Sequence, residues 1–373
     1  MASYRKLGKD NWQYIVDYKD ESGKRRFKTK SGFRTKSAAK EIAEELEITL
    51  KKNKNIINRD MLFTDYYEKW IHTHKLGRYS KSTDTAYRTA KKLVNEHFRG
   101  LKLSDLTMDH YQIFINDISK TRALETVRKN HQKVSSALRH AWHSGIIPID
   151  VTYNVKLSGL PGKSPADKFM EEEELNKFIE ELKKSSNLTW TSHYMLILQS
   201  STGMRIAEVM AITFDDIDFK NETLRINKSW DYKDTRTFKD TKNGVHRTID
   251  LDRPTLAWLK EYVIFQKERM LSSRFDNPKK LLFTNKYFEP LTVDGVNETM
   301  KSVCARIGIG TYTTHHLRHT HASKLLSGGV DIEIVAERLG DTSQTIQEVY
   351  AHVLQGQRDR NKDLVKKISA SIH

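Results

Sequence analysis

A cluster of chain-breaking residues divides this sequence into parts that fold separately. Residues 159–165 read Gly-Leu-Pro-Gly-Lys-Ser-Pro and hold two of the six prolines in the chain. Proline and glycine at this density are unfavourable in a helix or a central strand. The chain has 373 residues, a length that fits two or three domains. We therefore expect a domain boundary here and a polar linker earlier, at residues 51–55.

The first 55 residues have the pattern of a small sheet followed by a helix. Residues 12–18 alternate large apolar and other side chains, which predicts a strand with one buried face. After a turn, residues 24–30 predict a second strand, which carries the basic residues Lys24, Arg25, Arg26 and Lys28. Apolar residues then recur at helical spacing over residues 39–50, and Thr35 or Ser37 can cap that helix.

Helical spacing continues over residues 61–160. Leu62 and Phe63 precede Thr64 as a possible staple and cap. Further helices are predicted over residues 82–98, 107–118 and 124–142. The last of these helices surrounds an apolar seam with basic residues, among them Arg128, Lys129, Lys133 and Arg139.

The third segment, residues 168–373, is predicted to be mainly helical. Its one sheet signal is a hairpin, in which residues 223–227 and 245–251 flank a loop containing Asn243-Gly244. The fold class is therefore multidomain α+β. It comprises a small β-plus-helix module at residues 1–55, an all-α domain at 61–160, and a mainly α domain with a small antiparallel sheet at 168–373.

Positive charge is concentrated in the first two segments. Residues 1–60 hold 16 basic and 9 acidic side chains, residues 61–163 hold 17 and 9, and the remaining residues hold 31 and 30. A surplus spread over two folded segments suits a polyanion bound along a long surface, and nucleic acid is the leading partner. The alternative is a solvated basic surface with no specific ligand.

Composition argues against several other classes of protein. No stretch approaches the roughly 18 apolar residues of a membrane span, and the N-terminus lacks the apolar run of a signal peptide. Cys304 is the single cysteine, so the chain cannot form an internal disulfide and has too few thiols for a zinc ribbon. We therefore expect a cytoplasmic protein that has no membrane partner and does not use cysteine chemistry.

Three runs of polar residues in the third segment exceed what packing requires. They are Ser-Thr-Gly-Met-Arg-Ile-Ala-Glu at 201–208, Thr-Thr-His-His-Leu-Arg-His-Thr at 313–320, and Leu-Gly-Asp at 339–341 followed by Tyr-Ala-His-Val at 350–353. Each has a plain alternative when taken alone. Arg205 and Glu208 can be a surface ion pair, and Tyr350 can be an ordinary half-buried tyrosine. His315 and His319 have a metal-ligand spacing, but no His-Glu-x-x-His and no cysteine pair accompany them, so we expect no metal.

Taken together, the three runs resemble the tyrosine recombinase (phage integrase) family. The matching motifs are Thr-Gly-Met-Arg-x-x-Glu, a Lys-x-Gly on a hairpin, His-x-Leu-Arg-His-Thr, Leu-Gly-x, and a terminal Tyr-x-His-Val. Residues 32–38, Gly-Phe-x-Thr-Lys-x-Ala, are similar to the arm-binding modules of integrases from phages and conjugative elements of Gram-positive bacteria. The resemblance implies a three-stranded arm-binding module, a helical core-binding domain and a recombinase catalytic domain.

The chemistry of DNA strand transfer needs the residue types that these motifs supply. Without metal or attacking water, a protein nucleophile must attack the phosphodiester, and the phenol of Tyr350 can form a 3′-phosphotyrosine. Extra negative charge in the transition state calls for forked guanidinium donors, which Arg205 and Arg318 provide. The resemblance implies that His315 adds a hydrogen bond or accepts the tyrosine proton.

The departing 5′-oxygen needs a proton, which the resemblance assigns to a lysine on a hairpin loop. Lys242 is the best match and Lys239 is the alternative, while Glu208 is expected to orient its neighbours. Asp341 departs from the family, which usually has histidine or sometimes tryptophan at that place. A carboxylate there either points away, holds an arginine in place, or assists the Tyr350 proton.

These observations favour a site-specific DNA recombinase that needs no cofactor, metal or ATP. The resemblance implies double-stranded DNA attachment sites (core and arm), a homo-tetramer on DNA, integration and excision of a mobile element, and accessory excision and DNA-bending proteins. A C-terminal helix with Leu364, Val365 and Ile368 can dock on a neighbouring subunit or pack in its own. The rival hypotheses are a DNA-binding regulator that has lost catalysis and a metal-dependent nuclease, for which no acidic or His/Cys cluster is present.

Overall fold

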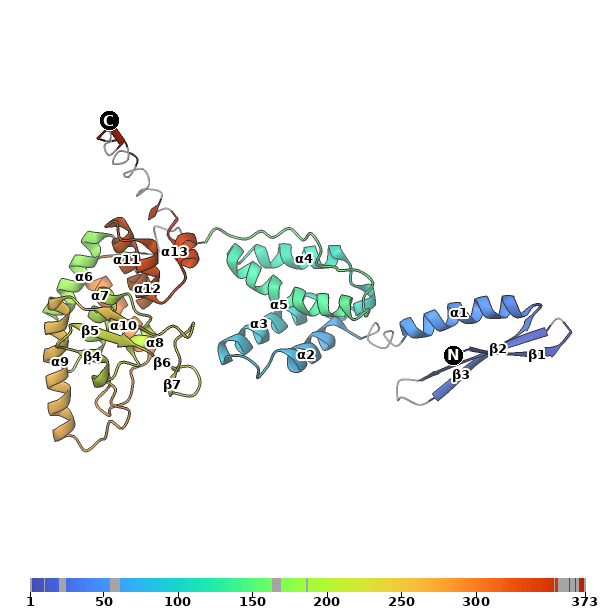
Figure 1. The fold of residues 1–373 in the computed structure, drawn as a ribbon, viewed down its shortest axis with the longest axis horizontal. Helices are drawn as coiled ribbons and strands as arrows, with labels where there is room; N and C mark the ends of the chain where they lie inside the picture. Colours follow the sequence, from blue (N-terminus) through green and yellow to red (C-terminus); the bar gives the residue numbers. More distant parts are fainter. Residues whose placement is uncertain are drawn as a thin grey trace. The chain divides into compact units, whose positions relative to one another are not determined.

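The computed structural model describes residues 2–9, 11–19, 25–53, 61–162, 169–185 and 187–351, with scattered positions between 353 and 371. The chain forms two compact units, Met1–Gly162 and Lys163–His373 (Figure 1). Each unit is described by itself. Lys24, residues 54–55 of the expected linker, Pro165, His352 and the apolar positions of the expected C-terminal helix lie outside the described residues.

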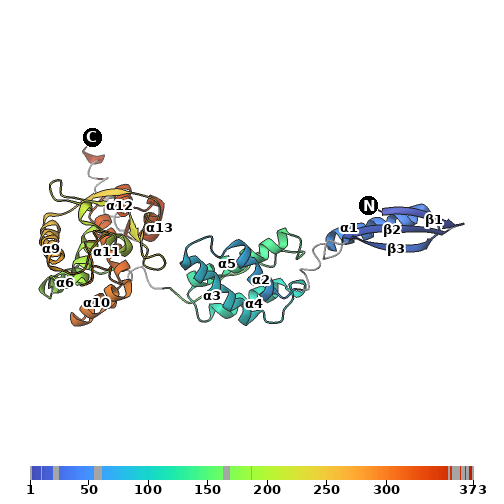
Figure 2. The same ribbon diagram turned by 90° about the horizontal axis from the view of Figure 1, so that it is seen from below.

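The N-terminal part of the first unit is an antiparallel sheet covered by one helix (Figures 1 and 2). The strands are β1 (Ala2–Gly8), β2 (Asn11–Lys19) and β3 (Arg25–Phe33), in that order, and the helix is α1 (Lys36–Asn53). Tyr14 and Val16 of β2 pack with Ala43 of α1 in a small core. Thr35 caps the helix, because its Oγ1 accepts from the backbone N of Ala38 at 3.2 Å.

The expected linker at residues 51–55 is wrong for its first three positions. Helix α1 continues through Asn53. Lysine has good helix propensity, and its charge is favourable near a helix C-terminus. Strand β1 also has no counterpart in the strand patterns of the sequence, because most of its side chains are exposed.

The rest of the first unit is a helical domain around one core. Its helices are α2 (Phe63–His74), α3 (Lys81–His97), α4 (Met108–Ser119) and α5 (Leu124–His143), with a short 3₁₀ turn at Leu103–Asp105. The expectation that Thr64 caps α2 is wrong, since Leu62 holds the N-cap position and Thr64 lies within the helix. The backbone N of Phe63 instead donates to the Leu101 carbonyl at 2.9 Å.

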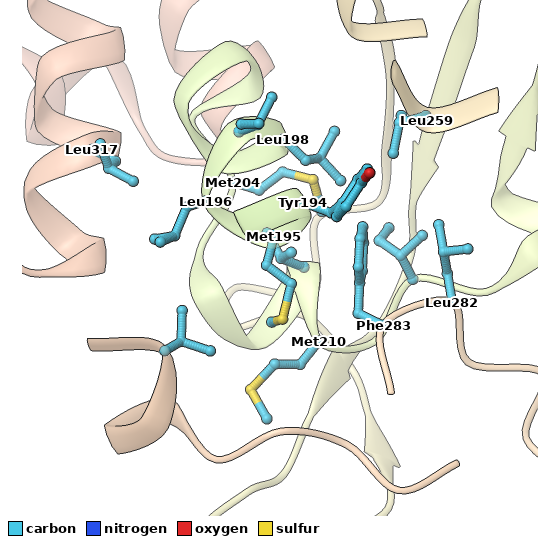
Figure 3. Packing of buried hydrophobic residues seen from close by; sticks show 14 of the residues in the cluster. Tyr194, Met195, Leu196, Leu198, Met204, Met210, Leu259, Leu282, Phe283 and Leu317 are labelled. Atoms are coloured by element: carbon cyan, nitrogen blue, oxygen red, sulfur yellow. The ribbon is translucent and has the colours of Figure 1, made fainter. Parts of the chain in front are cut away.

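The second unit is built around α7 (Thr191–Thr202), which is buried on nearly every side. Figure 3 shows Tyr194, Leu196 and Leu198 of this helix among Phe283 and side chains from other elements, with Leu317 on the neighbouring helix. The surrounding helices are α6 (Glu172–Lys184), α9 (Arg253–Ser272), α10 (Val293–Arg306) and α11 (Thr314–Ser327). The shorter helices are α8 (Ile206–Val209), α12 (Ile332–Leu339) and α13 (Ser343–Val349).

Two small antiparallel sheets complete the second unit. One has the order β4 (Ile217–Asp218), β5 (Thr223–Ile226), β8 (Arg247–Asp250), and the other pairs β6 (Ser229–Trp230) with β7 (Phe238–Lys239). Strands β5 and β8 pair as predicted, with Leu224 opposite Ile249. The connection between them is not a simple hairpin, because β6 and β7 interrupt it. Gly244 closes a separate turn, in which its N donates to the Thr241 carbonyl at 3.1 Å.

The predicted fold class is confirmed in each of its three parts: a three-stranded sheet with one helix, a helical domain, and a mainly α domain with small sheets. Within the described ranges, no helix is long and apolar enough to cross a membrane.

Candidate active site

Two arginines from distant parts of the second unit meet at one turn. Arg205 is the N-cap residue of α8, two residues after the left-handed Gly203 (φ 68°) that ends α7. Arg318 lies early in α11 and is 4% exposed. Its Nη1 donates to the Gly203 carbonyl and its Nη2 to the Leu339 carbonyl, each at 2.9 Å. The C-terminal ends of α7 and α12 therefore hold the guanidinium of Arg318.

Asp341 joins the two arginines through its carboxylate. Arg205 Nη2 donates to Oδ1 at 2.7 Å, and Arg318 Nη2 donates to Oδ2. Arg205 also donates to the Gly340 carbonyl, which lies 3.3 Å from Nη1 and 3.2 Å from Nη2. Of the three placements open to Asp341 in the sequence, the structure has the one that holds an arginine, and the carboxylate holds both.

Glu208 orients Arg205 and is tied to a buried arginine of β8, Arg247. The Glu208 carboxylate accepts from the backbone N of Arg205 at 3.0 Å and from Arg205 Nη1 at 3.1 Å. Arg247 Nη2 donates to Glu208 Oε2 at 2.7 Å, and Arg247 Nε donates to the Arg338 carbonyl at 2.7 Å. Burial raises the pKa of Glu208, but the hydrogen bond and charge of Arg247 and the charge of Arg205 outweigh it and lower that pKa overall.

The two candidate lysines have different surroundings. Lys239 of β7 forms an ion pair with Asp231, in which Nζ lies 3.3 Å from Oδ1. Lys242 is exposed in the turn before β8, and no carboxylate of the described chain lies within ion-pair distance of it. The next residue, Asn243, places its Nδ2 3.3 Å from the Gly340 carbonyl oxygen and 3.5 Å from Asp341 Oδ1. The turn that carries Lys242 thus touches the segment that joins the arginines.

His315 stands at the start of α11, one turn before Arg318. Desolvation of its ring lowers the pKa of His315 below the usual value, although part of the residue is exposed. The positive charges of Arg318, Arg205 and Lys242 act in the same direction. The neutral imidazole is therefore favoured near pH 7 and can accept a proton.

Tyr350 lies at the C-terminal end of α13 and is 4% exposed. It packs with Leu326, Leu339 and Ile346 in a small core of its own. Its hydroxyl is hydrogen-bonded to Nδ1 of His319 at 2.7 Å. Burial raises the pKa of the Tyr350 phenol, while the charge of nearby Arg318 acts in the opposite direction.

The paired histidines show no sign of a metal site. The rings of His315 and His319 meet edge to face with centroids 4.6 Å apart. Among the residues that the structure describes, no group of three His, Cys, Asp or Glu side chains could hold a metal ion.

The predicted DNA-contacting residues of β3 lie on both faces of the sheet. In an antiparallel pair, opposite residues share a face. Lys28 is opposite Val16, which faces α1, and Arg26 shares that face two residues along the strand. Arg25 lies on the open face, where Asp17 accepts from its Nη2 at 2.8 Å.

The predicted residues of α5 also have neighbours. Arg128 and Lys129 each lie near Glu125, at 3.7 Å and 3.5 Å. Lys133 Nζ donates to the Lys129 carbonyl at 2.9 Å, and Arg139 Nε lies 3.6 Å from Asp150 Oδ2. The two pairs with Glu125 are exposed on both sides, and exposed pairs are weak, so Arg128 and Lys129 remain able to bind an external anion.

Sequence reasoning missed three residues of the site. Arg247 shares its phase in β8 with Ile249 and Leu251, and that alternation was a signal for a buried arginine that needs an acidic partner. The spacing of His319 from His315 indicates only a metal ligand, although His319 stands in the same motif as Arg318. The Asn-Gly pair at Asn243 predicts a tight turn, but it does not predict a contact of the Asn243 side chain outside the loop.

Three consecutive parts of the chain match known sequence families. Residues 168–357 match the phage integrase family, residues 2–50 match an arm DNA-binding domain, and residues 62–119 match the N-terminal SAM-like domain of phage integrases. The first match alone spans half of the chain.

Relatives and solved structures agree with these matches. A XerC-like tyrosine recombinase of Caldanaerobacter subterraneus subsp. tengcongensis is 26% identical, with 96% of each chain covered. The integrase of Staphylococcus phage L54a is 22% identical over 89% of this chain and 99% of its own. In fold, the chain is similar to the Tn1549 transposon integrase in complex with a circular intermediate DNA (TM-score 0.67, 15% identity, 80% of this chain and 99% of that chain). It is also similar to a lambda integrase tetramer bound to a Holliday junction (TM-score 0.57, 18% identity, 91% and 97%).

A fold of this type, with its terminal tyrosine and paired arginines in one unit, defines a site-specific recombinase of the tyrosine class. The chain belongs to the phage integrase family.

Proposed function

We propose that this chain cuts and rejoins DNA at its attachment sites through a 3′-phosphotyrosine on Tyr350. The observation that carries the proposal is the carboxylate of Asp341, which lies between Arg205 and Arg318 and accepts from both. Two buried or half-buried guanidiniums that converge on one anion are suited to the oxygens of a phosphate. A DNA phosphate entering the site displaces or shares the donors that Asp341 now occupies.

The neighbouring groups supply the proton transfers. His315 is favoured in its neutral form, so it can accept the phenol proton as Tyr350 attacks phosphorus. The bond from phosphorus to the 5′-oxygen then breaks, and Lys242 gives that oxygen its proton. Lys239 is less suited to this task because it is paired with Asp231. Glu208 and Asp341 hold the arginines.

Covalent capture tests the role of Tyr350. A nicked suicide substrate loses the 5′-hydroxyl strand after cleavage, so the proposed nucleophile should remain attached to DNA in denaturant. The Tyr350→Phe variant should bind core-site DNA and form no adduct. Tyr312→Phe is the control, because Tyr312 is a part-buried tyrosine whose hydroxyl also bonds a protein side chain, donating to Glu174 at 2.7 Å. An adduct with Tyr350→Phe would disprove the assignment, and none with the unmodified chain would favour a regulator without catalysis.

A modified leaving group tests Lys242 against Lys239. Lys242→Ala should slow cleavage about 10²- to 10⁴-fold on an ordinary substrate, which is the usual contribution of general acid catalysis. In a substrate with sulfur at the bridging 5′ position, the leaving strand departs as a thiolate and needs little protonation. The sulfur substrate should therefore restore most of the cleavage rate that the Lys242→Ala variant has lost. If the sulfur substrate instead restores the cleavage rate of the Lys239→Ala variant, Lys239 is the proton donor.

We also propose that the N-terminal sheet binds arm sites and that the helical domain binds core sites. The open face of the sheet carries Arg25, whose guanidinium lies 5.4 Å from the exposed ring of Phe27. Removal of residues 1–55 should abolish binding to arm sites and leave core-site binding and cleavage, each steeply dependent on salt. Equal loss at both kinds of site would contradict this division.

In the cell, we propose that the chain integrates and excises a mobile element as a homo-tetramer on paired attachment sites. Accessory excision and DNA-bending proteins would set the direction. The lambda integrase structure contains a tetramer on a Holliday junction, and this likeness supports the proposed assembly. The molecular mass of the Tyr350→Phe complex with core-site DNA, measured by sedimentation, should correspond to four protomers and two duplexes.

A further inference from the structure

We propose that Asn243 is a positioning residue that holds the Lys242 turn against the arginine pair. This inference rests on the proposed role of Lys242 as the proton donor. Asn243 Nδ2 lies 3.3 Å from the Gly340 carbonyl oxygen and 3.5 Å from Asp341 Oδ1. Both acceptors belong to the segment that also receives Arg205.

Thr241 is buried at the base of the turn and the Asp240 carbonyl accepts from Ser229 Oγ at 2.8 Å, but these contacts do not reach the segment that receives Arg205. The side-chain hydrogen bonds of Thr241 and His246 stay within the loop, the first to the Val245 carbonyl at 2.9 Å and the second to Asp240 at 2.9 Å. Among residues 241–246 of the described chain, the side chain of Asn243 makes the hydrogen bonds that leave the loop. Lys242 itself is exposed, so its ammonium would otherwise sample many positions.

The acceptor for Asn243 is well fixed. Gly340 ends α12 in the left-handed region (φ 65°), and a Cβ there would come within 2.7 Å of Arg247 Nη1. The Gly340 carbonyl also accepts hydrogen bonds from both terminal nitrogens of Arg205. One main-chain oxygen thus sets the positions of a phosphate-binding guanidinium and of the lysine turn. Asn243 ties the leaving-group side of the reaction to the phosphate side.

A simpler explanation for this asparagine is turn propensity. Asn and Asp both favour tight turns, because their short side chains hydrogen-bond to nearby backbone. Asp retains that propensity but cannot donate to the Gly340 carbonyl, and its charge would face Asp341. The two explanations therefore differ for Asn243→Asp: turn propensity predicts normal cleavage, whereas a positioning role predicts a loss at least as large as that of Asn243→Ala.

The experiment compares cleavage of oxygen and bridging 5′-sulfur substrates in single turnover. On the oxygen substrate, Asn243→Ala should be about 3- to 10-fold slower, the range expected for one ordinary hydrogen bond. On the sulfur substrate it should match the unmodified chain, because a displaced proton donor no longer matters. In the background of Lys242→Ala, adding Asn243→Ala should cause no further loss. Asn221→Ala is the matched control, since Asn221 donates to Asp218 in another tight turn of the same unit at 2.7 Å.

The outcomes separate this inference from the proposed function. If the sulfur substrate restores the cleavage rate of Lys242→Ala but not that of Asn243→Ala, Lys242 is the proton donor and Asn243 does not act through it. Normal cleavage by Asn243→Asp would likewise overturn the positioning role. If sulfur restores neither variant and Lys239→Ala is restored instead, the proposed function of Lys242 fails and the inference falls with it. A slowdown in the Asn221→Ala control equal to that of Asn243→Ala would mark the effect as general loss of turn structure and also overturn the inference.

Discussion

The hydroxyl of Tyr350 is hydrogen-bonded to Nδ1 of His319, at 2.7 Å, inside a small apolar core. The phenol therefore has a partner that is neither an arginine of the pair nor His315. Burial also raises its pKa, which disfavours the phenolate in this position. This hydrogen bond fixes the position of the hydroxyl that we propose as the nucleophile.

A double-mutant cycle measures the Tyr350–His319 contact. Tyr350→Phe and His319→Ala should each lower the free energy of unfolding, and the two effects should not add. We expect a coupling energy of about 0.5–1.5 kcal/mol, the net value of a typical hydrogen bond. Urea titration of the four proteins provides the measurement. The control cycle pairs Tyr350→Phe with His316→Ala, because His316 bonds Thr313 instead. Equal coupling in both cycles would contradict the direct contact.

Gly340→Ala should damage the site through space as well as through backbone strain. Its Cβ would meet Arg247 Nη1 at 2.7 Å and push that arginine from Glu208. Gly308→Ala is a matched control, because Gly308 has a similar φ of 71° with no atom within 4 Å of a Cβ. Left-handed strain should cost each variant about 1 kcal/mol of unfolding free energy. Gly340→Ala should cost more and should also slow DNA cleavage, and equal values for the two variants would disprove the steric argument.

Asp341→Ala should turn the arginine pair into an open anion site. Without the carboxylate, the guanidiniums of Arg205 and Arg318 lie close together with no shared acceptor, which lowers stability. Inorganic phosphate should then raise the thermal midpoint by mass action, more than it does in the unmodified chain. The control is Asp215→Ala, which breaks an exposed ion pair with Lys280. A phosphate response that is the same in all three proteins would argue against an anion site.

His321 should make stability fall in acid. Burial, followed by the charge of Arg338, lowers the pKa of His321 from its usual 6.5 to about 4. Its Nε2 accepts from Arg338 Nε at 3.2 Å, which requires that nitrogen to be unprotonated. The folded state therefore binds fewer protons than the unfolded state between these values. This contribution, up to about 3 kcal/mol, is complete above pH 6.5 and is lost as the pH falls to about 4.

The measurement is the free energy of unfolding from pH 7 to pH 4, for the unmodified chain and for His321→Gln. Glutamine does not titrate and can present an oxygen to Arg338. The variant should therefore lose less stability over this range. Parallel curves for the two proteins would show that His321 does not titrate in the folded state as described.

Much of the fold could be predicted from periodicity because the elements with a buried face carry their pattern in the sequence. The helices at 82–98, 107–118 and 124–142 match α3, α4 and α5 within one or two residues. Strand β1 could not be found this way, since it is held by pairing with β2 and only alternate residues near its start are partly covered. The break between β5 and β8 was equally hidden, because two-residue strands such as β6 and β7 have no period to detect.

The candidate site could be predicted as a set of residues but not as a set of contacts. Motif spacing brought forward Arg205, Arg318 and Tyr350, yet it left three placements open for Asp341. Which donors the Asp341 carboxylate meets depends on how α12 ends relative to α7 and α11, and that is a matter of tertiary packing. The same holds for the Tyr350 hydroxyl, whose partner is on another helix.

The arginines of this site take many of their acceptors from the main chain. Arg318 bonds the carbonyls of Gly203 and Leu339, and Arg247 bonds that of Arg338. An alanine scan removes side chains and leaves every one of these oxygens where it is. At position 339 such a scan tests the buried leucine side chain, but it does not test the peptide group, which directs a guanidinium. The path of the backbone therefore positions these arginines, and substitution of single side chains does not test that contribution.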